Sequence, residues 1–92
     1  MDVIWRNEKA GEPSNAVGTF YSGRLGVAAV NGQYAGQVRI DLVDGRYHVL
    51  SFLDYKFRTA QKVEVIDSRG GLDEARSIGE ENLSGLFARL AA

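Results

Sequence analysis

The sequence predicts an α+β domain in which an antiparallel β-meander of four to five strands is packed by one C-terminal helix. Apolar and polar residues alternate in several runs before residue 66, and the dipeptides Asn31-Gly32 and Asp44-Gly45 between runs are typical of tight hairpin turns. After residue 71 the apolar residues recur at helical spacing. We expect one domain over residues 1–92, with the sheet in 1–66 and the helix in 72–90.

The composition is that of a folded domain and excludes several chemistries. Of 92 residues, 45% are apolar and 25% are charged. The chain has no Cys and one His, which excludes a disulfide scaffold and a thiol nucleophile and leaves little for a transition-metal site. We therefore expect no metal and no other cofactor.

Charge and hydropathy bear on partners and location. The formal net charge is −1, so bulk attraction to nucleic acid or to a membrane is not indicated. No apolar run approaches the roughly 18 residues that span a bilayer. The first residues lack the basic region and apolar segment of a signal peptide, so we expect a cytoplasmic protein with no membrane partner.

The strands follow from alternation and from turn residues. A loop over residues 6–15 contains the one proline, Pro13. In the run 54–58, alternation predicts that Tyr55 and Phe57 point one way and Lys56 and Arg58 the other. The predicted strands cover residues 3–5, 16–21, 24–30, 33–43, 46–53 and 62–66.

Two-residue turns set the expected register of two hairpins. Type I′ turns require positive φ at both central residues, which Asn, Asp and Gly tolerate best. A turn at 31–32 pairs Leu25 with Val38, and a turn at 44–45 pairs Val38 with Ser51, so both place Val38 on one face. The expected core face carries Leu25, Val27, Ala29, Tyr34, Val38, Ile40, Leu42, Tyr47 and Val49.

The opposite face supplies the first candidate binding surface. The same registers place Arg24 opposite Arg39, and Gln37 opposite Phe52. Two arginines facing each other are unfavourable unless an anion or an acidic partner lies between them. We therefore expect Arg24, Gln37, Arg39 and Phe52 to contact a partner.

A second candidate surface follows the next run. Lys56, Arg58 and Lys62 interleave with aromatic side chains, a pattern that can follow phosphates or an acidic protein. Eleven cations against twelve anions make direct nucleic-acid contact secondary. The alternative is a solvated strand edge, where Lys and Arg discourage further pairing.

The helix is expected to begin after Gly71, with Asp73 and Glu74 favoured in its first turn by the helix dipole. Gly79 marks either close packing or a kink. One apolar stripe contains Leu72, Ala75, Gly79, Leu83, Leu86, Phe87 and Leu90.

Catalysis has one candidate pair. His48, the only imidazole, lies opposite Asp41 and could act as a carboxylate-oriented general base. No nucleophile motif accompanies it, so we favour a non-enzymatic interaction protein that binds a protein or nucleoprotein complex. The alternative is a small-ligand-binding domain or a small enzyme that uses His48 and Asp41.

Two resemblances complete the sequence evidence. Val49, Phe52, Asp54-Tyr55 and Val63 resemble the Tudor-type pattern, with Lys56 where a glycine is usual. This resemblance implies the alternative fold, a small SH3/Tudor-like β-barrel with an appended helix.

The whole build, a meander followed by Gly71-Leu72-Asp73-Glu74-Ala75-Arg76 and an amphipathic helix, is similar to small phage or mobile-element accessory proteins, including anti-CRISPR inhibitors. This resemblance implies a phage-encoded inhibitor that occludes the nucleic-acid site of a protein or nucleoprotein complex, such as a CRISPR surveillance complex. It carries over no site residues.

Overall fold

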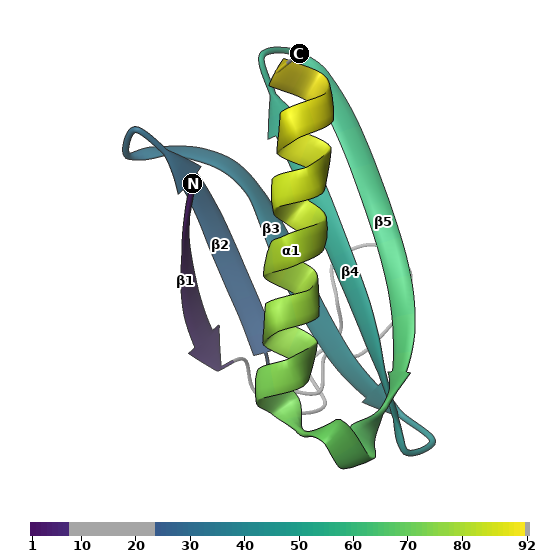
Figure 1. Ribbon diagram of the computed structural model, residues 1–92. Helices are drawn as coiled ribbons and strands as arrows, with labels where there is room; N and C mark the ends of the chain where they lie inside the picture. Colours follow the sequence, from purple (N-terminus) through teal and green to yellow (C-terminus); the bar gives the residue numbers. More distant parts are fainter. Residues whose placement is uncertain (8–23, 92) are drawn as a thin grey trace.

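A computed structural model describes residues 1–7 and 24–91. Five antiparallel strands lie in sequence order, and one helix crosses one face of the sheet (Figure 1). This arrangement confirms the predicted α+β fold. The elements are β1 (Asp2–Asn7), β2 (Arg24–Val30), β3 (Gln33–Val43), β4 (Arg46–Tyr55), β5 (Arg58–Asp67), the short 3-10 helix η1 (Ser68–Gly70) and α1 (Leu72–Ala91).

The sheet formed by the described strands is open. β1 and β5 are the edges of this five-stranded order and do not pair with each other, so these strands do not close into the alternative barrel. The expected strand at 16–21 lies outside the described residues. β1 extends over six residues, further than the expected 3–5.

The β3–β4 hairpin has the expected register. Asp44 and Gly45 form the turn with φ of 51° and 75°, the positive values of a type I′ turn. Val38 pairs with Ser51, as the turn chemistry and the alternation both predict. The pairs Gln37–Phe52 and Asp41–His48 also form as expected.

The β2–β3 hairpin departs from the expected register. Ala29 pairs with Tyr34 next to the turn, but Ala28 pairs with Gly36, so Ala35 is an extra residue on β3. Such a bulge shifts every later pair by one residue. The expected pairs Leu25–Val38 and Arg24–Arg39 are therefore wrong.

The bulge exchanges the two faces of β2. Gly26 now pairs with Val38 and lies on the helix face, whereas Leu25 pairs with Arg39 on the other face. A Cβ at Gly26 would meet Val3 and the Trp5 ring at 2.8–3.0 Å. The absence of a side chain at Gly26 therefore leaves room for the half-buried Trp5.

The β4–β5 hairpin was not predicted. Lys56 and Phe57 form its turn, with φ of 51° and 63°, and Tyr55 pairs with Arg58 across it. The expected alternation through 54–58 is wrong, and β5 begins at Arg58 rather than at 62. This register places Leu53 opposite Ala60, and both side chains pack under the helix. The removal of these side chains from water favours this register over its neighbours.

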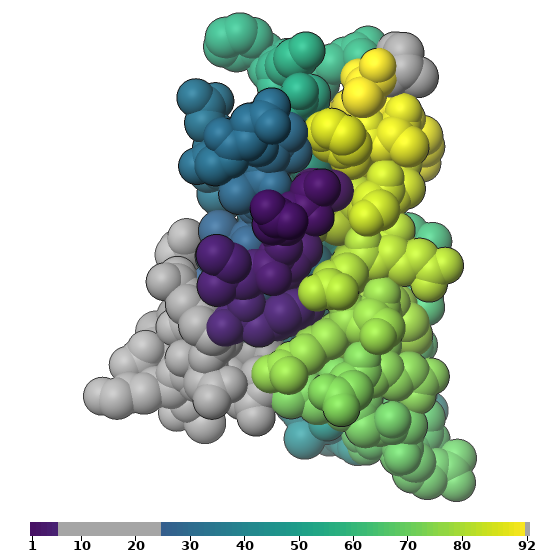
Figure 2. All heavy atoms as spheres, turned by 60° about the vertical axis from the view of Figure 1, so that its left-hand side comes forward, coloured from purple at the N-terminus to yellow at the C-terminus, as the bar shows by residue number. Residues whose placement is uncertain are grey.

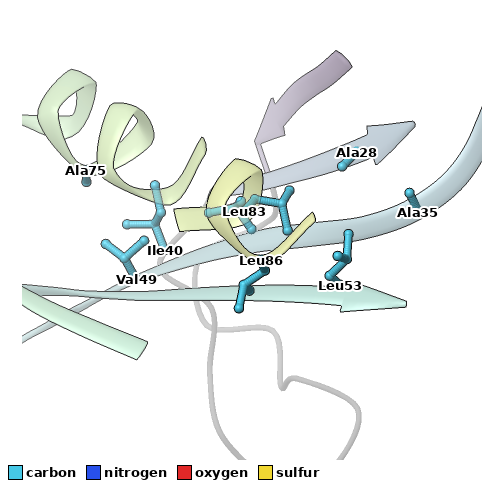
Figure 3. Close-up of a cluster of buried hydrophobic side chains, with 9 residues drawn as sticks. Ala28, Ala35, Ile40, Val49, Leu53, Ala75, Leu83 and Leu86 are labelled. Atoms are coloured by element: carbon cyan, nitrogen blue, oxygen red, sulfur yellow. The ribbon is translucent and has the colours of Figure 1, made fainter. Parts of the chain in front are cut away.

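The core lies between α1 and the sheet, and Figure 3 shows helix leucines directed at side chains of β3 and β4. The predicted helix stripe is confirmed. Tyr34 and Leu42 are wrong as core residues, because each lies two residues from a hairpin turn and is 57% or 48% exposed. The buried apolar cluster comprises Ala28, Ala35, Val38, Ile40, Val49, Leu53, Ala75, Leu83 and Leu86.

Gly79 marks close packing and not a kink. The helix runs without interruption from Leu72 to Ala91. A Cβ at Gly79 would overlap Val38 Cγ1 and would lie 3.2 Å from Val49 Cγ1. The helix axis therefore approaches the sheet at this residue.

The first strand is attached to the helix by a polar contact. Trp5 Nε1 donates a hydrogen bond of 2.7 Å to Glu80 Oε1. The Arg76 guanidinium lies 5.5 Å from the centre of a Trp5 ring. In Figure 2, β1 lies against the yellow-green part of α1, in agreement with these contacts.

Candidate interaction surface

The β2–β3 turn, the β4–β5 turn and the end of α1 lie toward the same end of the molecule, in the upper part of Figure 1. In Figure 2 the β4–β5 turn projects from this end beyond the rest of the chain. A pocket of 310 Å³ joins the β2–β3 and β4–β5 turns. It is lined by Val30, Asn31, Gln33, Tyr34, Ala35, Asp54, Tyr55 and Lys56.

The turn itself is strained and exposed. Positive φ values are unfavourable for residues other than glycine, and most of all for bulky ones. Both Lys56 and Phe57 adopt them, and the Phe57 side chain is fully exposed at 106%. Packing of the Phe57 side chain therefore does not compensate the strain within this chain.

The turn stands on a supported base. The Tyr55 ring contacts the Phe87 ring edge to face, with centroids 5.0 Å apart. Arg58 Nη1 donates a hydrogen bond of 2.9 Å to the Leu90 carbonyl at the end of α1. The Lys56 ammonium lies 5.3 Å from the centre of the Tyr55 ring. The contacts of Tyr55 with Phe87 and of Arg58 with Leu90 hold the base of the turn against the helix.

Tyr34 and Asp54 line the same pocket from different hairpins. Partial burial and the negative charge of Asp54 raise the pKa of the Tyr34 hydroxyl above 10.0. Tyr34 therefore stays neutral near pH 7 and can donate a hydrogen bond. We call Tyr34, Asp54, Tyr55, Lys56 and Phe57 the turn-end surface.

The first predicted surface is only partly assembled. Gln37 and Phe52 pair directly, and Arg39 lies on the same sheet face, away from α1. Arg24 pairs with Ile40, so the expected Arg24–Arg39 pair does not form. The two arginines therefore give no reason to expect an anion between them. The bulge at Ala35 is the physical reason.

The second predicted surface is divided among separate roles. Lys56 lies in the turn, Arg58 binds the Leu90 carbonyl, and Lys62 Nζ lies 3.9 Å from Glu64 Oε1. These three cations therefore do not form one continuous phosphate track. Lys62 lines a second pocket, of 350 Å³, with Glu81, Asn82, Gly85, Leu86 and Arg89 of the helix.

Asp41 and His48 face each other as predicted. Among the described residues no hydrogen bond or ion pair joins them, and Asp41 Oδ1 is buried without a hydrogen-bond partner there. Neither pocket described above is lined by either residue. Within residues 1–7 and 24–91, no three His, Cys, Asp or Glu residues are placed to hold a metal ion.

Sequence reasoning missed two residues of the turn-end surface, because it assigned Tyr34 to the core and Asp54 to no site. It included Phe57 in the candidate run of aromatic and basic residues but placed it on a strand and not in a turn. A Lys-Phe dipeptide carries no turn signature, so the uninterrupted alternation concealed the hairpin. The interleaved aromatic and basic residues at 55–58 were the signal that did point to this region.

No protein-family model, curated protein or solved structure matches this chain. The described part of the chain has no helix that is both long and apolar enough to cross a membrane. The class defined by the fold is thus a small α+β domain with an open antiparallel sheet and a single covering helix.

Proposed function

We propose that this chain is a non-enzymatic interaction protein that binds its partner through the turn-end surface. The observation that carries the proposal is Phe57, a fully exposed aromatic residue on a turn strained at both central positions. Strain of this kind persists where the fold over-determines it and is concentrated at functional sites. An exposed Phe57 gives the fold no packing energy, so its use is contact with another molecule.

The chemistry of the surface indicates a protein partner. Aromatic side chains in well-packed pockets contribute most of the energy at many protein interfaces. Phe57 would enter an apolar pocket of the partner, and Lys56 would meet an acidic group beside it. Tyr34 and Asp54 add a hydrogen-bond donor and a carboxylate on the neighbouring hairpin.

The finer form of the proposal is a cytoplasmic, phage-type inhibitor that occludes the nucleic-acid site of a protein or nucleoprotein complex, such as a CRISPR surveillance complex. The similarity of build supports it. Direct binding of phosphates through this surface is secondary, because Asp54 lies beside Lys56 and the net charge is −1.

The test replaces the strained turn with a favourable one. The double variant Lys56→Asn/Phe57→Gly has the preferred type I′ sequence and removes both candidate contact side chains. We expect its free energy of unfolding to rise by about 1–2 kcal/mol, because the left-handed strain is relieved. Partner binding should fall at the same time.

The assay immobilises the chain, recovers the partner from extract with and without nuclease, and then titrates the purified partner. Ser84→Glu, an exposed helix position away from the turn, is the matched control and should bind normally. His48→Ala should also bind normally. Unchanged partner binding by the turn variant contradicts the proposal. A loss of biological activity in His48→Ala alone also contradicts it. Capture that depends on nucleic acid would support direct contact with nucleic acid instead.

A further inference from the structure

Among the described strands, β5 is a long, regular edge strand that pairs only with β4. Its ten residues pair with β4 in one continuous register from Arg58 to Asp67. The other edge, β1, has six residues. An unpaired edge of this length is a template for another strand, and proteins usually blunt such edges with bulges, very short strands or charged side chains such as Lys. β5 carries Lys62, but Glu64 two residues further on gives the edge both signs of charge.

Backbone geometry identifies which groups face outward. Tyr55 and Arg58 flank a two-residue turn, so the Arg58 N–H is directed toward β4. Alternation along an antiparallel pair then directs every second residue's backbone groups inward, beginning with Arg58. The residues with outward N–H and C=O groups are Thr59, Gln61, Val63, Val65 and Asp67.

We propose that β5 pairs antiparallel with β5 of a second copy, around a two-fold axis at Val63, and joins two sheets into one of ten strands. In this register Val63 meets Val63 of the second copy. Lys62 meets Glu64 of the second copy, and Glu64 meets its Lys62. These opposite charges lie in non-hydrogen-bonded pairs, where side chains approach most closely.

Charge and length distinguish this register from its neighbours. If the two-fold axis moves by one residue, two Lys62 or two Glu64 side chains lie face to face, and such a pair of like charges is unfavourable. An axis at residue 61 or 65 shortens the overlap to seven or five residues, whereas an axis at 63 uses residues 59–67 of both copies. The strand is therefore self-complementary in one register.

The apolar side chains of β5 also fit this arrangement. Val63 and Val65 point away from the helix and are 58% and 47% exposed. Pairing would place the two Val63 side chains against each other and Val65 beside Gln61 of the second copy. Both exposed valines would thereby lose part of their contact with water.

The helices leave room for the pairing. α1 lies over β4. In the dimer, β4 would be separated from β4 of the second copy by the two β5 strands, which is a distance of three strand spacings. The two helix axes would thus lie about 14 Å apart. Packed helices lie about 8–10 Å apart, so no clash results. No residue of the turn-end surface takes part, so the inference stands independently of the proposed function.

Sedimentation equilibrium of the full chain, from micromolar to submillimolar concentration, should show a monomer–dimer equilibrium. Lys62→Glu and Glu64→Lys should each weaken the dimer by about tenfold, because like charges then face each other. The double variant Lys62→Glu/Glu64→Lys should restore the wild-type dissociation constant. Thermal melts check that each variant folds. A monomer at every concentration, or no rescue in the double variant, would overturn the proposal.

The register is tested by cross-linking, because the chain has no native cysteine. Val63→Cys should form a disulfide-linked dimer on mild oxidation, since the two Cα atoms would lie about 5.5 Å apart. Val65→Cys is the matched control. Its Cα atoms would lie roughly 13 Å apart, beyond the reach of a disulfide. Equal cross-linking of both variants would refute the register.

Discussion

Ser51 Oγ donates a buried hydrogen bond of 2.9 Å to the carbonyl oxygen of Gly79. Ser51 lies on β4 and is fully buried beneath α1. The bond forms because Gly79 has no side chain and the helix backbone can approach the sheet. This contact sets the height of the helix above the core.

Adding one methyl group at this contact should destabilise the protein. In Gly79→Ala the new Cβ would overlap Val38, at a cost of about 1–3 kcal/mol that exceeds the gain in helix propensity. Gly85→Ala is the matched control, because nothing lies within 4 Å of its Cβ. It should stabilise the protein by up to about 1 kcal/mol. Urea unfolding measures both, and equal stabilisation would disprove the close approach.

Burial of the sheet core can be tested with two isoleucines. Ile40 is 1% exposed and Ile4 is 71% exposed. Ile40→Ala should lower the free energy of unfolding by about 2–5 kcal/mol, because it leaves a cavity. The same change at Ile4 should cost under about 0.5 kcal/mol. Chemical denaturation of both variants provides the comparison, and similar midpoints would mean that α1 does not cover Ile40.

The contact between β1 and α1 can be followed by fluorescence, since Trp5 is the only tryptophan. Glu80→Ala removes the acceptor of the Trp5 hydrogen bond and should cost about 1.5 kcal/mol or more, with a shift in emission. Glu80→Gln keeps an oxygen acceptor and should lose less. An unchanged stability of Glu80→Ala would show that the bond contributes nothing.

Arg58 is expected to act on the helix and not on a partner. Its guanidinium binds the Leu90 carbonyl, where a cation also favours the helix dipole. Arg58→Ala should cost about 0.3–1 kcal/mol. It should also speed amide hydrogen exchange in the last turn of α1, and Arg58→Lys should lose less. If Arg58→Ala leaves amide hydrogen exchange unchanged and weakens partner binding, Arg58 would instead belong to the interaction surface.

The Tyr34 hydroxyl should titrate above its ordinary pKa, chiefly because of burial and further because of Asp54. Asp54→Asn should lower the Tyr34 pKa but leave it raised. Since the neutral form is favoured in the folded state, this contribution to stability is present below the unfolded pKa and is lost as pH rises through the folded pKa. NMR titration of the tyrosine ring carbons measures the shift. An unchanged Tyr34 pKa in the variant would mean that Asp54 does not act on it.

The sequence by itself determined the features that depend on local chemistry. Asp44-Gly45 has one favourable hairpin geometry, and with the alternation on both sides it determined the β3–β4 register. The helix stripe followed from its spacing, because helical periodicity needs no knowledge of the partner surface. Gln37, Arg39 and Phe52 were accordingly placed correctly on one face.

Only the tertiary structure decided the rest. The bulge at Ala35 brought Gly26 beneath Trp5 and separated Arg24 from Arg39, and no turn residue marks it. The Lys56-Phe57 turn has unfavourable local chemistry and exists because pairing β5 with β4 buries Leu53 and Ala60. Burial of a whole strand outweighs the preferences of two turn residues. For that reason Phe57, the most exposed aromatic residue of the described part of the chain, could not be placed from its neighbours in the sequence.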